Sequence, residues 1–266
     1  MNSPQLSAPL SEMLTALKAG LGNHEDLYRF DLQGVDLQGA NLSQVSLLGA
    51  HLSGAILCEA NLQGVDLRGA DLRGADLRGA CLQDACLNRA ALQKANLSGA
   101  NLTGAKLQVA YYDRETIWPE GYSYKSSGAI GPGANLAGAY LSTANLRDAD
   151  LQGANLLGAY LSGTDLTGAN LQDARLSGAD LRLVYLTGAY LRNARLNGVD
   201  LQGADLRAAD LSGVEIDHLQ SIAGADFTLV QGLSEAARAM LLSRKAAELD
   251  VWNPYTRRTT RESLGS

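Results

Sequence analysis

A leucine recurs at every fifth position along most of this 266-residue chain. The spacing holds from Leu32 to Leu107 without interruption, resumes at Leu136 and continues to Leu211, with Ile216 as its last member. If each leucine is numbered i, position i−2 is nearly always Ala or Val, i−1 is usually Asp or Asn, and i+2 is most often Gly. This period constrains the fold more than any other feature of the sequence.

Neither regular secondary structure gathers these leucines on one side. A helix turns by 100° per residue, so leucines five residues apart would lie about 140° apart around its axis. In a continuous strand, side chains five residues apart point to opposite faces. A bend every five residues does gather them, because positions i−2 and i then point one way while i−1 and i+1 point the other, and Gly at i+2 accommodates the bend.

Four such bends bring the chain back over itself. Each coil of about 20 residues would stack on the preceding one at the spacing of β-strands, about 4.8 Å, with leucines filling the axis. A unit that cannot bury its apolar side alone is typical of a solenoid. The repeats would make about eight coils in a stack about 40 Å long.

The array, seen in "GADLRGADLRGACLQDACLN" from Gly69 to Asn88, resembles that of the pentapeptide-repeat family. The resemblance implies an all-β fold, a right-handed quadrilateral parallel β-helix. Because the two ends of a solenoid need covers, we expect short terminal α-helical caps. We therefore divide the chain into a cap helix in residues 1–23, a repeat coil in 24–227, and a cap helix with a tail in 228–266.

The cap helices are predicted from the spacing of apolar residues. Ser11–Leu21 has its leucines at helical intervals, and Leu233–Leu249 has a helical pattern with Ser234 as N-cap. We expect an irregular tail beyond this second helix, fixed to the terminal coil by Trp252 and Tyr255.

An inserted loop is predicted at residues 111–133, because the interval from Leu107 to Leu136 is not a multiple of five. The segment is rich in Tyr, Gly and Pro, and Trp118 with several tyrosines indicates that it packs on the coil. Similar W-P-E-G loops interrupt many members of the family. We interpret the segment as a docked structural insertion, with a recognition loop as the alternative.

The sequence offers no constellation of catalytic or metal-binding residues. Its three histidines lie far apart, and Cys81 and Cys86 are successive i−1 residues that project from neighbouring sides. Five aspartates, Asp66, Asp71, Asp76, Asp180 and Asp205, precede Leu-Arg, so their outward neighbours are basic. A convex coil with a filled interior has no cleft for chemistry. We predict no enzyme activity, cofactor, metal or small-molecule substrate.

Outward tyrosines and arginines form the candidate interaction surface. If one coil takes four repeats, Tyr140 stacks on Tyr160 and Arg175 on Arg195, and Tyr and Arg are favoured at binding hot spots. The alternative is that these ladders only stabilise the coil. The candidate residues are Tyr140, Tyr160, Tyr185, Tyr190, Arg175, Arg195, Trp118 and Tyr124.

These features predict a non-catalytic scaffold or protein–protein interaction module. We expect it to bind a protein partner, which the sequence does not identify. The resemblance implies an alternative, since some family members mimic DNA and bind type II topoisomerases (gyrase) through an acidic rod. A rod of about 40 Å would need on the order of two dozen negative charges to match B-DNA, whereas the whole chain has a net charge of −6.

The remaining expectations concern location and assembly. No run of 18 apolar residues or export leader is present in the sequence, and three cysteines cannot form a paired framework, so we expect a cytoplasmic protein without a membrane span. Three arginines in the tail are too weak a signal to predict direct nucleic-acid binding. We expect a monomer or homodimer. Similar proteins are abundant in photosynthetic bacteria, and some regulate development.

Overall fold

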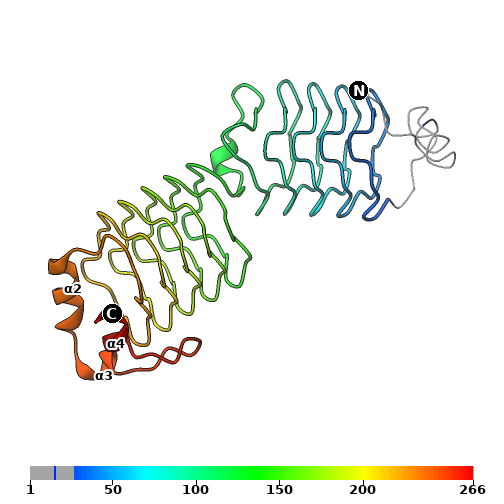
Figure 1. Ribbon diagram of the computed structural model, residues 1–266. Helices are drawn as coiled ribbons and strands as arrows, with labels where there is room; N and C mark the ends of the chain where they lie inside the picture. Colours follow the sequence, from blue (N-terminus) through cyan, green and yellow to red (C-terminus); the bar gives the residue numbers. More distant parts are fainter. Residues whose placement is uncertain (1–14, 16–26, 266) are drawn as a thin grey trace. The chain divides into compact units, whose positions relative to one another are not determined.

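The computed structural model describes residues 15 and 27–265 (Figure 1). The chain divides into two compact units, Met1–Ala129 and Ile130–Ser266. The N-terminal cap helix predicted over Ser11–Leu21 falls outside the described residues except for Thr15. The helices of the described part are η1 (Tyr124–Ser126), α2 (Glu235–Leu242), α3 (Ala246–Leu249) and α4 (Thr260–Leu264).

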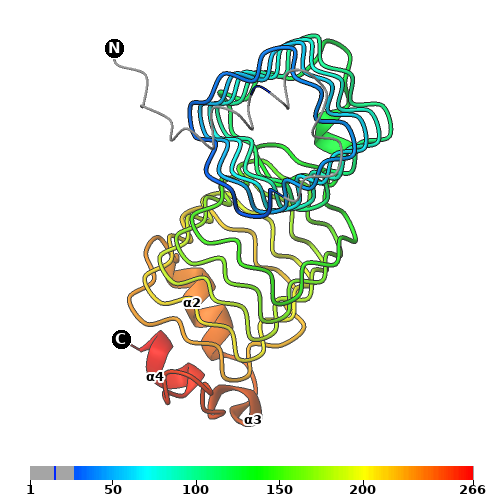
Figure 2. The same cartoon turned by 90° about the vertical axis from the view of Figure 1, so that its right-hand side faces the viewer.

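Both units are coils joined by parallel β-bridges between positions four repeats apart. Asp31 pairs with His51, which pairs with Asp71, and in the second unit Tyr140 pairs with Tyr160. Figure 2 shows the successive coils of the first unit stacked on one another. Bridges recur at every repeat, so each outward i−1 residue belongs to one of four columns and has a neighbour above and below it.

The backbone N–H groups of each repeat are bonded in a fixed pattern. In Leu72–Asp76, positions i and i+2 donate to the next coil, i+3 donates to the Leu72 carbonyl, and the last residue donates to the preceding coil, at 2.8 to 3.0 Å. The remaining N–H, that of Arg73, donates to the Asp71 carboxylate at 3.1 Å. An Asp or Asn at i−1 therefore completes the bonding of the repeat.

Each repeat ends in a β-turn closed by the bond from i+3 to i. The residue at i+2 has positive φ, +65° at Gly74 for example, while i+1 does not, which is the pattern of a type II turn. Glycine adopts this conformation without a steric penalty, which is the physical reason for its frequency at i+2. Lys94 and Leu183 occupy the same position with φ of 62° and 57°.

The leucines of the period fill the axis of each unit. Those from Leu32 to Leu107 and from Leu136 to Leu211 expose at most 5% of their surface. The small residues at i−2 are buried beside most of them. The prediction of an inward leucine ladder is confirmed, and each such leucine contributes about 1.5–3 kcal/mol of transfer free energy.

The segment predicted as a loop at residues 111–133 is coil in its first part, which corrects the prediction. Tyr111 pairs with Ala91 and Ile117 pairs with Asn96, and Tyr112 is buried at the position of a leucine. The partners of the second bridge lie one position further apart in the sequence than the partners of the first, because one extra residue is inserted between the two repeats. The excursion from the coil is confined to the residues after Trp118 and contains η1.

The array also continues past Ile216. Ile222 and Phe227 are buried at the leucine position, and Asp200 pairs with Ser221, one position further along the chain than the regular register. A single extra residue therefore shifts the spacing of the sequence without ending the coil.

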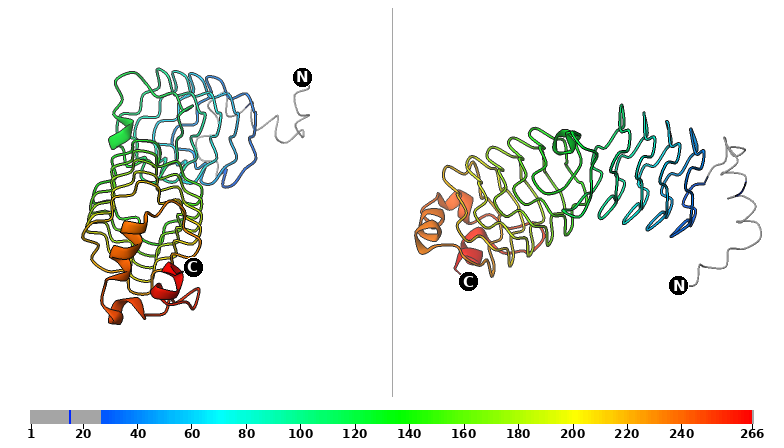
Figure 3. Two further views of the ribbon diagram at one scale, coloured as in Figure 1. Left: turned by 60° about the vertical axis from the view of Figure 1, so that its left-hand side comes forward. Right: turned by 90° about the horizontal axis from the view of Figure 1, so that it is seen from above.

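The C-terminal helix is broken into two, which corrects the prediction of one helix over Leu233–Leu249. The Ser234 side chain caps α2 by accepting the Ala237 N–H at 3.1 Å, but α2 ends at Leu242 and α3 begins at Ala246. Figure 3 shows these helices gathered at the end of the second unit.

The tail is ordered, contrary to the prediction of an irregular segment. Trp252 pairs with Thr259 in an antiparallel bridge. Thr259 and Glu262 form a capping box that starts α4. Residues 252–259 are therefore a hairpin, called the C-terminal hairpin below.

Side chains of this region bind the backbone of the last coil. Glu248 accepts the Ile222 N–H at 2.6 Å, Arg244 donates to the Leu219 carbonyl at 3.1 Å, and the Thr260 hydroxyl donates to the Ile222 carbonyl at 3.0 Å. The first two bonds satisfy edge groups that a further coil would otherwise bind, whereas the Ile222 carbonyl also accepts the Ala225 N–H of its own turn. No helix among the described residues is long and apolar enough to cross a membrane.

Candidate interaction surfaces

The eight candidate residues are divided between the two units. Trp118 and Tyr124 belong to the first unit and the other six to the second. Within the second unit, the six are spread over four columns, as the bridges show: Tyr140 with Tyr160, Arg175 with Arg195, Tyr185 between Asp165 and Asp205, and Tyr190 between Asn170 and Asp210.

Tyr140 and Tyr160 form an exposed stack. Their ring centroids lie 4.7 Å apart and the rings are parallel within 3°. The spacing follows from the register of the bridges, which places one tyrosine directly above the other. Tyr140 exposes 83% of its surface and Tyr160 exposes 44%, so the stack presents an aromatic face to solvent.

Tyr185 is covered by the C-terminal hairpin. Its ring lies 4.9 Å from that of Tyr255, and the hydrogen bond between the two side chains raises the pKa of Tyr185 to about 12. The prediction that Tyr255 fixes the tail to the coil is confirmed by this contact. Trp252, in contrast, projects into solvent.

The stacked arginines and Tyr190 occupy separate places. Arg175 pairs with Arg195 along one column, and Arg195 Nε lies 3.4 Å from Glu215 Oε1 in the next coil. Tyr190 is exposed in another column. Neither set contacts the Tyr140–Tyr160 stack through a bridge.

Trp118 and Tyr124 form an aromatic cluster at the end of the first unit. The two rings are parallel at 5.2 Å, Tyr122 stacks on Trp118 at 5.8 Å, and the buried Tyr112 meets Trp118 edge-on at 5.6 Å. Because Tyr112 lies on the axis, the cluster holds the excursion against the coil.

The family model for pentapeptide repeats matches this array, with eight copies over residues 31–69, 59–93, 70–108, 144–182 and 184–217. The chain belongs to the pentapeptide-repeat family. Its coils are accordingly those of a right-handed β-helix.

Several solved structures resemble this pentapeptide-repeat chain. The pentapeptide repeat protein alr5209 from Nostoc PCC 7120 is 45% identical over 47% of this chain and 94% of its own, with a TM-score of 0.39. HetL, a pentapeptide repeat protein involved in heterocyst differentiation regulation in the cyanobacterium Nostoc sp. strain PCC 7120, is 32% identical over 81% and 95%, with a TM-score of 0.37. Full-length QnrB1, a plasmid-mediated fluoroquinolone resistance protein, is 20% identical over 84% and 94%, with a TM-score of 0.34. No curated protein matches the chain.

Ion pairs along the pentapeptide repeats neutralise many of the outward carboxylates. In five repeats an arginine at i+1 binds the aspartate at i−1 with nitrogen–oxygen distances of 2.6 to 2.8 Å: Asp66–Arg68, Asp71–Arg73, Asp76–Arg78, Asp180–Arg182 and Asp205–Arg207. The hydrogen bond from Arg73, for example, lowers the pKa of the Asp71 carboxyl. The described residues contain no group of three His, Cys, Asp or Glu side chains suited to a metal ion.

Sequence reasoning missed the contribution of Asn253. This residue is 1% exposed and its side-chain amide donates to the carbonyls of Gly203, Ala204 and Gly224 at 3.4, 3.1 and 2.7 Å. The Asn-Pro dipeptide that it begins is a turn signal, but the contacts lie 29 to 50 residues away. Only the folded coil brings them together.

Proposed function

We propose that this chain is a non-catalytic scaffold that binds a protein partner through the outer wall of its second unit. One observation carries the proposal: leucine and alanine fill the interior of the coils, so recognition falls on outward side chains. The Tyr140–Tyr160 stack is the exposed aromatic feature best suited to it.

The stack favours binding because it is preorganised. The bridge between Tyr140 and Tyr160 fixes both backbones, and stacking restricts both rings, so little side-chain entropy remains to be lost on association. Tyrosine also combines a large apolar ring with a polar hydroxyl. This suits a surface that contacts water when free and a partner when bound.

The finer features of the proposal concern shape and setting. The four columns suggest a quadrilateral coil, and the bonds from Arg244, Glu248 and Thr260 to the last coil support a role for the C-terminal helices as a cap. We place the protein in the cytoplasm, as a monomer or homodimer, without a cofactor.

The experiment compares partner capture by the wild type and by the double variant Tyr140→Ser/Tyr160→Ser, with mass spectrometry of cross-linked proteins from native lysate. We expect the variant to fold normally and to lose a captured protein that the wild type retains. Tyr190→Ser, an exposed tyrosine in another column, is the matched control and should retain it. Equal capture by all three proteins would contradict the proposal, and a large loss of stability in the double variant would assign the stack a structural role.

The alternative of an acidic DNA mimic acting on gyrase receives less support from the surface. A mimic needs a run of unneutralised charges, whereas the aspartates of five repeats are bound by arginines at i+1. A supercoiling assay tests the alternative directly. We expect no inhibition of gyrase at micromolar concentrations of the protein.

A further inference from the structure

One backbone carbonyl in each repeat of the second unit accepts no hydrogen bond from a backbone N–H group. The carbonyls at i−1, i, i+1 and i+3 accept bonds from neighbouring coils or from the turn, but in the described coils of this unit the carbonyl at i+2 accepts no backbone N–H. Because the register repeats once per coil, Gly163, Leu183 and Gly203 follow one another along one corner. In the described coils of this unit these carbonyls are available to side-chain donors, as Gly198 is to Gln220 Nε2 at 2.8 Å.

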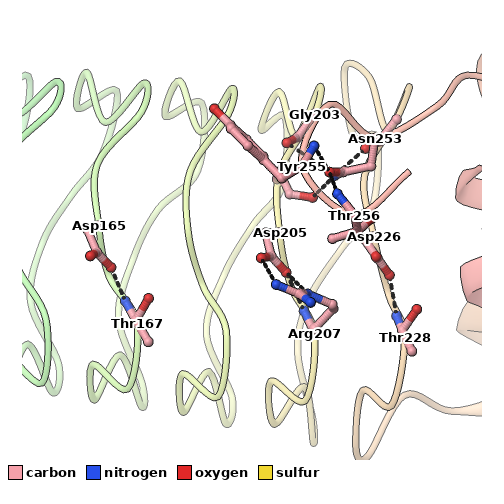
Figure 4. A network of polar contacts seen from close by, with 12 residues as sticks. Asp165, Thr167, Gly203, Asp205, Arg207, Asp226, Thr228, Asn253, Tyr255 and Thr256 are labelled. Carbon is pink, nitrogen blue, oxygen red and sulfur yellow. Dashed lines mark hydrogen bonds and ion pairs between the residues drawn. The ribbon is translucent and has the colours of Figure 1, made fainter. Parts of the chain in front are cut away.

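The C-terminal hairpin shows what such a corner can bind. Asn253 donates its amide to the i+2 carbonyl of Gly203 and to that of Gly224 in the next coil. Two residues later, Tyr255 packs its ring on the outward Tyr185. Figure 4 shows Asn253 and Tyr255 lying along the wall beside Gly203. The part in contact, Asn253–Tyr255, is thus an uncharged segment seated on a corner through an amide and an aromatic ring.

The same corner is uncovered in the two preceding coils. No donor from the described residues reaches the carbonyls of Gly163 and Leu183. A depression of about 260 Å³ lies there, lined by Ser162, Arg182, Leu183 and Gln202. Leu183, 39% exposed, forms its apolar part.

An aromatic residue and balanced charge complete the site. Tyr160 precedes the repeat that contributes Ser162 and Gly163, and its exposed ring continues into the stack with Tyr140. Arg182 is bound by Asp180 at 2.7 Å and lies 4.0 Å from Asp200. With its one cation paired, the depression suits a neutral segment better than an acidic peptide or a nucleic acid.

We infer that this depression binds an extended segment of a partner protein that carries a side-chain amide followed two residues later by an aromatic ring. The amide donates to the carbonyls of Gly163 and Leu183, and apolar atoms pack on the Leu183 side chain. The ring packs on Tyr160, on the wall before the corner, because the column of Tyr185 continues to Asp165 and Asn145 and offers no aromatic partner there. The inference rests on the proposed interaction function and names the chemistry of the partner.

The test uses the full chain and a neutral synthetic peptide, acetylated and amidated, with the sequence of Val251–Thr256 (VWNPYT). Backbone amide chemical shifts are followed by NMR during titration. We expect saturable shifts centred on Gly163 and Leu183, and no binding by a peptide in which Asn is replaced by Leu.

Two matched variants test the role of the leucine. Leu183→Asn removes the apolar wall and should weaken peptide binding by about tenfold or more. Leu229→Asn is the control, because Leu229 is also exposed and also has positive φ, 58° against 57°. Asn is well tolerated at positive φ, so both variants should fold, and the control should bind as the wild type does.

Two outcomes would overturn the inference. One is the absence of saturable shifts, and the other is shifts centred on Gly203 and Gly224, which would mean that the peptide only displaces the chain's own hairpin. Either result leaves the capture experiment with Tyr140 and Tyr160 unaffected, so failure of this site and failure of the interaction function are separate results.

Discussion

At the scale of the residue, the main role of the Asp or Asn before each leucine is to accept a hydrogen bond from the backbone. Its side-chain oxygen accepts the N–H of the residue at i+1, as Asp71 does for Arg73 and Asn96 does for Ser98. This bond explains why both Asp and Asn occur at i−1, although only one of them carries a charge. The arginine at i+1 then adds a second, charge-assisted contact to the same carboxylate.

Substitutions of Asp71 separate the two contributions. Asp71→Ala removes the acceptor of the Arg73 N–H and should lower the free energy of unfolding by about 1 kcal/mol. Asp71→Asn keeps the acceptor and loses only an exposed ion pair, so its cost should be below about 0.5 kcal/mol. Urea unfolding followed by circular dichroism measures both, and equal losses in the two variants would show that charge, not backbone bonding, dominates.

At the scale of the element, the C-terminal hairpin depends on one buried amide. Asn253 donates to the wall and also accepts the N–H groups of Tyr255 and Thr256 at 2.9 and 3.0 Å. It therefore forms the hairpin turn and fixes that turn to the coil at the same time. An arrangement of this kind is all-or-none, because losing the side chain leaves groups on both sides unpaired.

Asn253→Ala should destabilise the second unit by about 2–3 kcal/mol, since it leaves several buried polar groups without partners. Limited proteolysis should also cut the tail faster than in the wild type. Asn155→Ala is the control, because Asn155 donates only one exposed bond, to Asn135 at 2.9 Å. A tail that stays resistant in the Asn253 variant would show that the aromatic contact alone holds the hairpin.

At the scale of the whole molecule, repetition turns small electrostatic effects into a pH dependence. Burial raises the pKa of Asp205, but the hydrogen bonds from Arg207 outweigh it and leave the pKa below its ordinary value. The pKa values of Asp66, Asp76 and Asp180 are lowered as well, primarily by hydrogen bonds from their arginines. All these groups favour the folded state in their charged form.

The sign of the pH effect follows from linkage. A carboxyl whose pKa is lower in the folded state stabilises that state fully above its unfolded pKa, near about 3.9, and loses the effect as pH falls through the folded pKa. We expect the melting temperature to be constant from about pH 7 to about pH 5 and to fall below about pH 4. Asp205→Asn should make the fall shallower, and a melting temperature that stays independent of pH down to about pH 3 would contradict the linkage.

The coils could be predicted from the sequence because a single local rule, one leucine per repeat of five, holds along them. The prediction fails where a residue other than leucine fills the inward position, or where a repeat has one extra residue. Tyr112 and Trp118 replace leucine at the end of the first unit, so that stretch is predicted as an inserted loop. The extra residue before Ser221 shifts the spacing of the sequence, but the predicted coil still extends to residue 227. The exposure of the candidate residues was harder to predict, because Tyr185 is covered by Tyr255 from a distant segment.

The bridges whose partners lie one position further apart than the others, such as Asn96 to Ile117 and Asp200 to Ser221, bear on how such a chain can evolve. An inserted codon is absorbed locally, between one bridge and the next, while the wall residues beyond it again have neighbours in register. Duplication of a block of four repeats would add one complete coil that carries the same outward side chains. Length and surface can thus vary independently, and new recognition features can arise in one round without disturbing the rest.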